Sequence, residues 1–199
     1  MSQNKHKRVI KRRTRVSGNP LGVRNILYPL NLIYTRIGIT HPSVKEVLPN
    51  KIPEPYRSLL VHNDDMTLTL ERHFGDRIVL RPLSTFSHSG WYFRRVLLVQ
   101  EYSGRPVEMG AIRIKLEVFD QRLRAKILKN KIPLGRILRD KRFAYINRVK
   151  AFLAITPNSE MMGLFWMREP KILYGRRTEI LQRNKKIGDI VEILPLVFR

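Results

Sequence analysis

Between residues 77 and 119 the chain alternates apolar with polar positions or gathers its apolar residues into short runs. Three such segments, RIVLRPLSTFS, WYFRRVLLVQEY and VEMGAIRIKLEVF, are separated by the turn sequences HSG and SGRP. Val, Ile, Tyr and Phe favour strands, and breaks that contain glycine favour tight turns. The pattern therefore predicts three consecutive antiparallel strands in a meander.

The C-terminal part repeats this extended pattern. LYGRRTEILQ, the turn RNKK and IGDIVEILPLVF predict a final hairpin, and a further strand is expected at residues 144–155. A short helix rich in methionine is expected between that strand and the hairpin. Its methionines are interpreted as core filler, because an unbranched thioether fits irregular gaps.

Helical patterns lie on either side of the meander. The segment DDMTLTLERHFG predicts a helix that Asn63 or Asp64 caps and Gly75 ends. A second helix is expected over residues 120–129, and Pro133 is well placed to begin a third. Strands grouped in runs, with helices between the runs, favour an α+β fold with a largely antiparallel sheet.

The N-terminal region has a different composition. Residues 1–24 are strongly basic, and no acidic residue occurs before Glu46, so this segment is expected to be a flexible arm. The arm is either a contact for nucleic acid or an anionic membrane, or a solubilising terminus. Residues 25–52 carry several prolines and are expected to be a linker that packs on the domain formed by residues 53–199.

Composition and charge exclude several classes of chemistry. The chain has 199 residues and a formal net charge of +23. It has no cysteine, so disulfides and a thiol nucleophile are excluded. No secretory signal and no apolar stretch of membrane-spanning length is recognisable, so a cytoplasmic protein is expected. The histidines lack metal-ligand spacing, and no nucleotide-binding loop occurs, so neither a metal nor a cofactor is expected.

Two adjacent arginines stand out on the strand WYFRRVLLV. Arg95 shares one face with apolar neighbours, and Arg94 shares the other face with apolar neighbours. At least one guanidinium is therefore expected to be buried or to lie at the edge of a pocket. A planar guanidinium there can bind a carboxylate in a bidentate manner, or it can pair with an acidic residue of the sheet.

The last strand raises a similar question, because Glu192 alternates with apolar residues. A carboxyl group on such a face can have a raised pKa and act as an acid or a base. Arg176 or Arg177 on the preceding strand can equally neutralise it across the hairpin. The PLGR segment, residues 133–136, opens a helix whose free backbone N–H groups can meet an anion.

Four ordered stretches carry a family resemblance: LLVHNDDMTLTLE, YFRRVLLV, PLGRIL, and YGRR followed by VEILP. Together they make residues 53–199 resemble the chorismate pyruvate-lyase family. The resemblance implies a chorismate-lyase-like α+β fold: a monomer with an antiparallel sheet flanked by helices, and a ligand enclosed beneath helical flaps. It also implies a cofactor-independent lyase that converts chorismate to 4-hydroxybenzoate and pyruvate, a step of quinone biosynthesis.

By this resemblance Arg95 grips a carboxylate of the dianionic substrate, and Glu192 is the catalytic residue at the ring position of the ether oxygen. Met66 and Leu134 match positions that line the pocket. These four residues must then converge in space. Two other functions remain open: a noncatalytic domain of the same fold that binds a small aromatic acid as an effector, and a basic RNA-associated protein.

The chain also departs from the family's pattern. Its PVEMGAIRI segment carries two charged residues, Glu108 and Arg113, near the middle of a predicted strand. With Arg177 they are additional candidates for the site. A glutamate or arginine added to the pocket would select another ligand.

Overall fold

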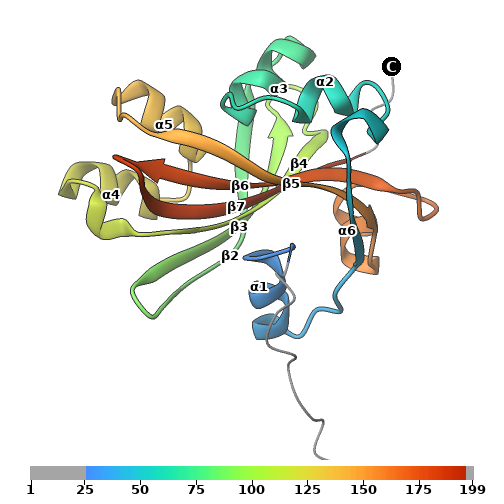
Figure 1. Ribbon diagram of the computed structural model, residues 1–199, viewed down its shortest axis with the longest axis horizontal. Helices are drawn as coiled ribbons and strands as arrows, with labels where there is room; N and C mark the ends of the chain where they lie inside the picture. Colours follow the sequence, from blue (N-terminus) through green and yellow to red (C-terminus); the bar gives the residue numbers. More distant parts are fainter. Residues whose placement is uncertain (1–25, 196–199) are drawn as a thin grey trace, which may run out of the picture.

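A single antiparallel sheet of seven strands organises the chain. The computed structural model describes residues 26–195. The strands lie in the order β1-β5-β6-β7-β4-β3-β2, with helices on both faces (Figure 1). Their bounds are β1 Ser43–Val47, β2 Ile78–His88, β3 Trp91–Gln100, β4 Pro106–Ile114, β5 Ile146–Thr156, β6 Leu173–Gln182 and β7 Lys185–Leu194.

The predicted meander and the predicted hairpin are both confirmed, and β4 and β7 pair to join them into one sheet. The β6–β7 turn places Arg183 and Asn184 at φ 47° and 61°. Two successive residues with positive φ form the kind of turn whose twist matches a hairpin. The predicted fold class, an α+β fold with a largely antiparallel sheet flanked by helices, is therefore confirmed.

The helices divide between the two faces of the sheet. One face packs against α2–α5 and the other packs against α1 and α6, each pair of layers enclosing buried apolar side chains. The bounds are α1 Leu30–Ile37, α2 Tyr56–Leu60, α3 Met66–Phe74, α4 Gln121–Leu128, α5 Leu134–Asp140 and α6 Ser159–Leu164; short 3₁₀ turns lie at Pro49–Lys51 and Leu116–Val118.

The helix starts follow the predicted chemistry with one correction. Asp65, and not Asn63 or Asp64, caps α3: its carboxylate accepts a hydrogen bond of 2.8 Å from the backbone N–H of Leu68. The polar run NDD offers three adjacent capping side chains, and only the packing of α3 selects among them. Gly75 ends α3 in the left-handed region at φ 63°, as expected.

The N-terminal part is only partly described. The expected arm, residues 1–24, lies outside the described residues. The expected linker, of which the structure describes residues 26–52, contributes regular elements: α1 buries Leu30 and Ile33 in the core, and β1 pairs with β5 at the sheet edge. Within residues 26–195, no helix is long and apolar enough to cross a membrane.

Candidate functional site

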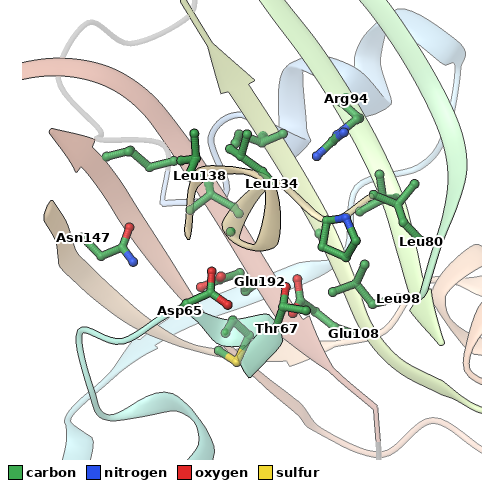
Figure 2. Close-up of a pocket in the computed structure, with 18 of the residues that line it drawn as sticks. Asp65, Thr67, Leu80, Arg94, Leu98, Glu108, Leu134, Leu138, Asn147 and Glu192 are labelled. Carbon is green, nitrogen blue, oxygen red and sulfur yellow. The ribbon is translucent and has the colours of Figure 1, made fainter. Parts of the chain in front are cut away.

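A cavity of about 70 Å³ lies between one face of the sheet and the helices α3 and α5. Its floor is formed by β3, β4 and β7, and apolar side chains make up most of its wall (Figure 2). The polar side chains that line it are Asp65, Thr67, Arg94, Glu108, Tyr145, Asn147 and Glu192.

Arg94 supplies a positive charge in this cavity. The residue is only 3% exposed, yet no acidic side chain among the described residues pairs with it. Its Nη1 donates to Oδ1 of Asn130 at 3.3 Å, and its Nε has no partner. Burial lowers its pKa to about 10, so the guanidinium remains charged at neutral pH. A buried and uncompensated cation is costly, and an anion in the cavity would offset that cost.

Three carboxyl groups gather apart from Arg94, around Thr67 in Figure 2. Burial raises the pKa of Asp65 and raises the pKa of Glu108 well above its ordinary value, and the charge of Glu192 acts in the same direction on both. Glu108 is 3% exposed, and its Oε2 has no hydrogen-bond partner. This carboxyl group therefore favours its neutral, protonated form.

Glu192 is neutralised across the hairpin. Its Oε2 accepts a hydrogen bond of 2.5 Å from Nε of Arg176, its direct register partner on β6. Arg176 also donates to backbone carbonyls of the α2–α3 connection, at 3.2 Å to Leu60, 2.7 Å to His62 and 3.2 Å to Asp64. The pair therefore ties the cavity floor to the segment that leads into α3.

The cavity roof depends on one close approach. A Cβ at Gly135 would lie 1.4 Å from a carboxylate oxygen of Asp65, so only glycine lets α5 approach the start of α3 this closely. The same contact brings Leu134 of α5 and Met66 of α3 over the sheet, where both line the cavity.

Four residues that the sequence analysis assigned to the site line this cavity: Met66, Leu134, Glu108 and Glu192. Arg95 does not, and its assignment to a substrate carboxylate is corrected. Neighbouring residues of a strand point to opposite faces, and Arg95 points to the face that carries α1 and α6. There it forms an ion pair with Glu160, and its guanidinium lies 5.3 Å from the ring centroid of Tyr34.

Arg113 and Arg177 also lie on that far face and are removed from the candidate site. Both contact the buried Asp189, at 2.8 Å from Nε of Arg113 and 3.5 Å from Nη2 of Arg177. Arg113 is further held against the ring of Trp91, at 4.1 Å from its centroid. These contacts form a structural charge network.

Sequence reasoning missed Arg94 and Asp65 as members of the site. Strand alternation identified Arg94 as one of two candidates, but it carried no information on which face would be covered by α3 and α5. Asp65 was assigned no role, because the cap of α3 was expected at Asn63 or Asp64. Among the described residues, no cluster of His, Asp and Glu is arranged to hold a metal ion.

Comparison with known protein families and with curated proteins finds no match. Several solved structures are similar to this chain in fold alone. A gene product of Staphylococcus aureus subsp. aureus N315 is similar with a TM-score of 0.51 at 8% identity, covering 68% of this chain and 90% of that one.

Two further solved structures have lower scores. PhnF from Mycobacterium smegmatis has a TM-score of 0.47 at 12% identity, over 68% of this chain and 65% of that one. The C-terminal domain of the histidine utilization repressor from Pseudomonas syringae pv. tomato has a TM-score of 0.38 at 15% identity, over 62% of this chain and 98% of that one. This chain thus spans about two-thirds of the length of PhnF.

The prediction of a chorismate pyruvate-lyase is wrong, and with it the expected lyase chemistry and quinone biosynthesis. Three of the solved structures similar to this chain are titled as a transcriptional regulator, as the ligand-binding domain of a transcriptional regulator, or as an effector domain. The site itself disagrees as well. Arg95 and Glu192, the two residues assigned to substrate, point to opposite faces of the sheet, and Arg176 already holds Glu192.

Proposed function

We propose that this domain is a noncatalytic binding domain for a small organic carboxylate, which it encloses in the cavity between the sheet and α3 and α5. The observation that carries the proposal is Arg94, a buried guanidinium with no acidic partner among the described residues, in the wall of the cavity. A bound carboxylate supplies the missing counter-charge and accepts hydrogen bonds from the planar fork.

The other charged side chains of the cavity do not act as the counter-charge of Arg94. Glu192 is paired with Arg176, and Asp65 accepts from the N-terminus of α3 and lies 3.4 Å from Nη1 of Arg139. Arg94 is held in place by Asn130, whose Oδ1 also accepts from the hydroxyl of Tyr92 at 2.9 Å. The guanidinium is thus positioned before a ligand arrives, which lowers the entropy cost of binding.

Cavity size limits the ligand. The volume of about 70 Å³ is roughly half that of an engineered cavity of ~150 Å³ that accepts benzene. This volume suits a short aliphatic acid better than an aromatic one.

Titration of the full chain with sodium acetate, propionate, butyrate, valerate and benzoate tests the proposal, with isothermal calorimetry or NMR shifts as the readout. At least one acid should bind more tightly than its uncharged amide by about tenfold, because the amide lacks the charge-assisted hydrogen bonds. Arg94→Gln should abolish this difference.

Arg81→Gln is the matched control, because Arg81 is an exposed arginine of β2 outside the cavity. This control also separates specific binding from the general attraction of anions by a chain of net charge +23. General attraction weakens with salt and responds equally to either substitution. Binding that survives Arg94→Gln, or no binding of any acid, would overturn the proposal.

A further inference from the structure

Glu108 is the other unsatisfied polar group of the cavity. Its side chain is buried, its Oε2 has no hydrogen-bond partner, and the cavity wall includes it. The opposite oxygen lies over Gly110, where a Cβ would come within 2.9 Å of Oε1. Glycine at this position therefore leaves the space that the carboxyl group occupies.

The groups that face Glu108 already have partners. Glu192 on β7 is held by Arg176 on β6, and Asp65 accepts from the first turn of α3 and contacts Arg139. None of these charges pairs with Glu108 itself. An unpartnered carboxyl beside two other carboxyls favours a cation or a hydrogen-bond donor as its neighbour.

The strand register separates Glu108 from Arg94. Glu108 pairs with Leu98, and Leu98 lies four residues from Arg94 on the same face of β3, which places the two backbone positions about 13 Å apart. Figure 2 shows the labelled Arg94 away from the labelled carboxyls Asp65, Glu108 and Glu192. The cavity thus has a cationic end and a carboxyl end with an apolar wall between them.

We infer that the ligand is a short ω-amino carboxylic acid, whose carboxylate binds Arg94 and whose ammonium group binds Glu108. This inference rests on the proposed carboxylate-binding function and adds the second group of the ligand. A zwitterion balances both unpaired ends at once, and an unbranched methylene chain matches the apolar wall and the small volume. Arg94 supplies affinity for acids in general, and Glu108 supplies the preference for the amine.

Proton release accompanies this mode of binding. The empty cavity favours protonated Glu108, because burial and the nearby Glu192 and Asp65 raise its pKa more strongly than Arg176 lowers it. An ammonium group beside the carboxyl stabilises its ionised form. Binding of the zwitterion at neutral pH should therefore release up to one proton, which a hydroxy acid of the same length would not do.

The test compares matched ligands of equal length on the full chain. β-Alanine, 4-aminobutyrate and 5-aminovalerate are titrated beside butyrate, valerate and hexanoate, in which a methyl group replaces the ammonium group. At one length the amine should bind about tenfold more tightly than its methyl partner. In Glu108→Gln this ratio should fall to about one.

Calorimetry in two buffers of different ionisation enthalpy measures the released proton in the unmodified chain, so the inference stays testable even if Glu108→Gln folds poorly. Acids that bind without preference for the amine would overturn the inference and leave the proposed function standing. A preference for the amine that persists in Glu108→Gln would also overturn the inference alone. So would equally tight binding of 4-hydroxybutyrate and 4-aminobutyrate without proton release. Failure of every acid to bind would overturn both.

Discussion

Two adjacent arginines have different partners on the two faces of the sheet. Arg95 lies under α1 and α6, where Glu160 neutralises it. Arg94 lies under α5, where the described residues offer it an amide oxygen and no acid. The two side chains are equally deep, at 5% and 3% exposed, so burial does not distinguish them.

Their partners distinguish them instead. A buried ion pair whose charges balance is a structural element, and removing one member leaves an unpaired charge behind. A buried charge without a protein partner in the wall of a cavity leaves that imbalance for a ligand to correct. A buried arginine without a protein counter-ion is therefore a candidate to bind an anionic ligand, and four predictions test this difference between the two faces.

The largest effect is expected for the ion pair between Arg176 and Glu192, on the cavity face of the sheet. Arg176→Met should lower the free energy of unfolding by about 3–5 kcal/mol, because it leaves Glu192 buried without a partner and frees three backbone carbonyls. Urea denaturation measures the change. The double variant Arg176→Met with Glu192→Gln should recover part of the loss, whereas an additive double variant would contradict a coupled pair.

The two adjacent arginines provide the direct comparison. Arg95→Met should destabilise the chain by about 2 kcal/mol, since it strands Glu160, whose side chain is partly exposed at 24%. The same substitution at Arg94 should leave stability unchanged or raise it by about 1 kcal/mol, because it removes a charge that has no partner. Equal losses at both positions would mean that Arg94 is a structural residue too.

One helical glycine on each face allows the tightness of helix packing to be compared. Gly135→Ala should cost about 2 kcal/mol, because the new methyl group meets the Asp65 carboxylate that caps α3. Gly163→Ala in α6, on the other face, meets nothing within 4 Å and should stabilise the chain by up to about 1 kcal/mol. Thermal unfolding of the two variants measures the difference, and a neutral Gly135→Ala would argue against the close approach of α5.

The last prediction concerns the pH dependence of stability. Because the folded state raises the pKa of Glu108, the unfolded chain loses this proton first as the pH increases. The unmodified chain should therefore lose stability relative to Glu108→Gln by about 1.4 kcal/mol per pH unit above the ordinary glutamate pKa. Urea denaturation of both proteins from pH 4.5 to 7.5 measures this slope, and parallel curves would indicate that Glu108 is ionised in the fold.

Much of the fold followed from local patterns. Alternation and turn residues predicted the meander and the final hairpin, and the capping and glycine signals predicted α3, α4 and α5 within one or two residues. These features depend on residues that are neighbours in the chain, so the sequence alone could predict them. The sequence could not predict which residue of the run NDD caps α3, because the selection of Asp65 depends on where α5 approaches.

Strand alternation alone places Arg94 and Arg95 on opposite faces of β3, and the predicted hairpin lets Arg176 or Arg177 reach Glu192. Only the tertiary structure decided which face α3 and α5 cover, and hence that Arg94 lines the cavity and Arg95 meets Glu160. The physical reason is that strand geometry is set by adjacent residues, whereas the counter-charge of each arginine comes from an element far away in the chain. Whether a buried charge is satisfied by the protein or left for a ligand is a property of that long-range packing.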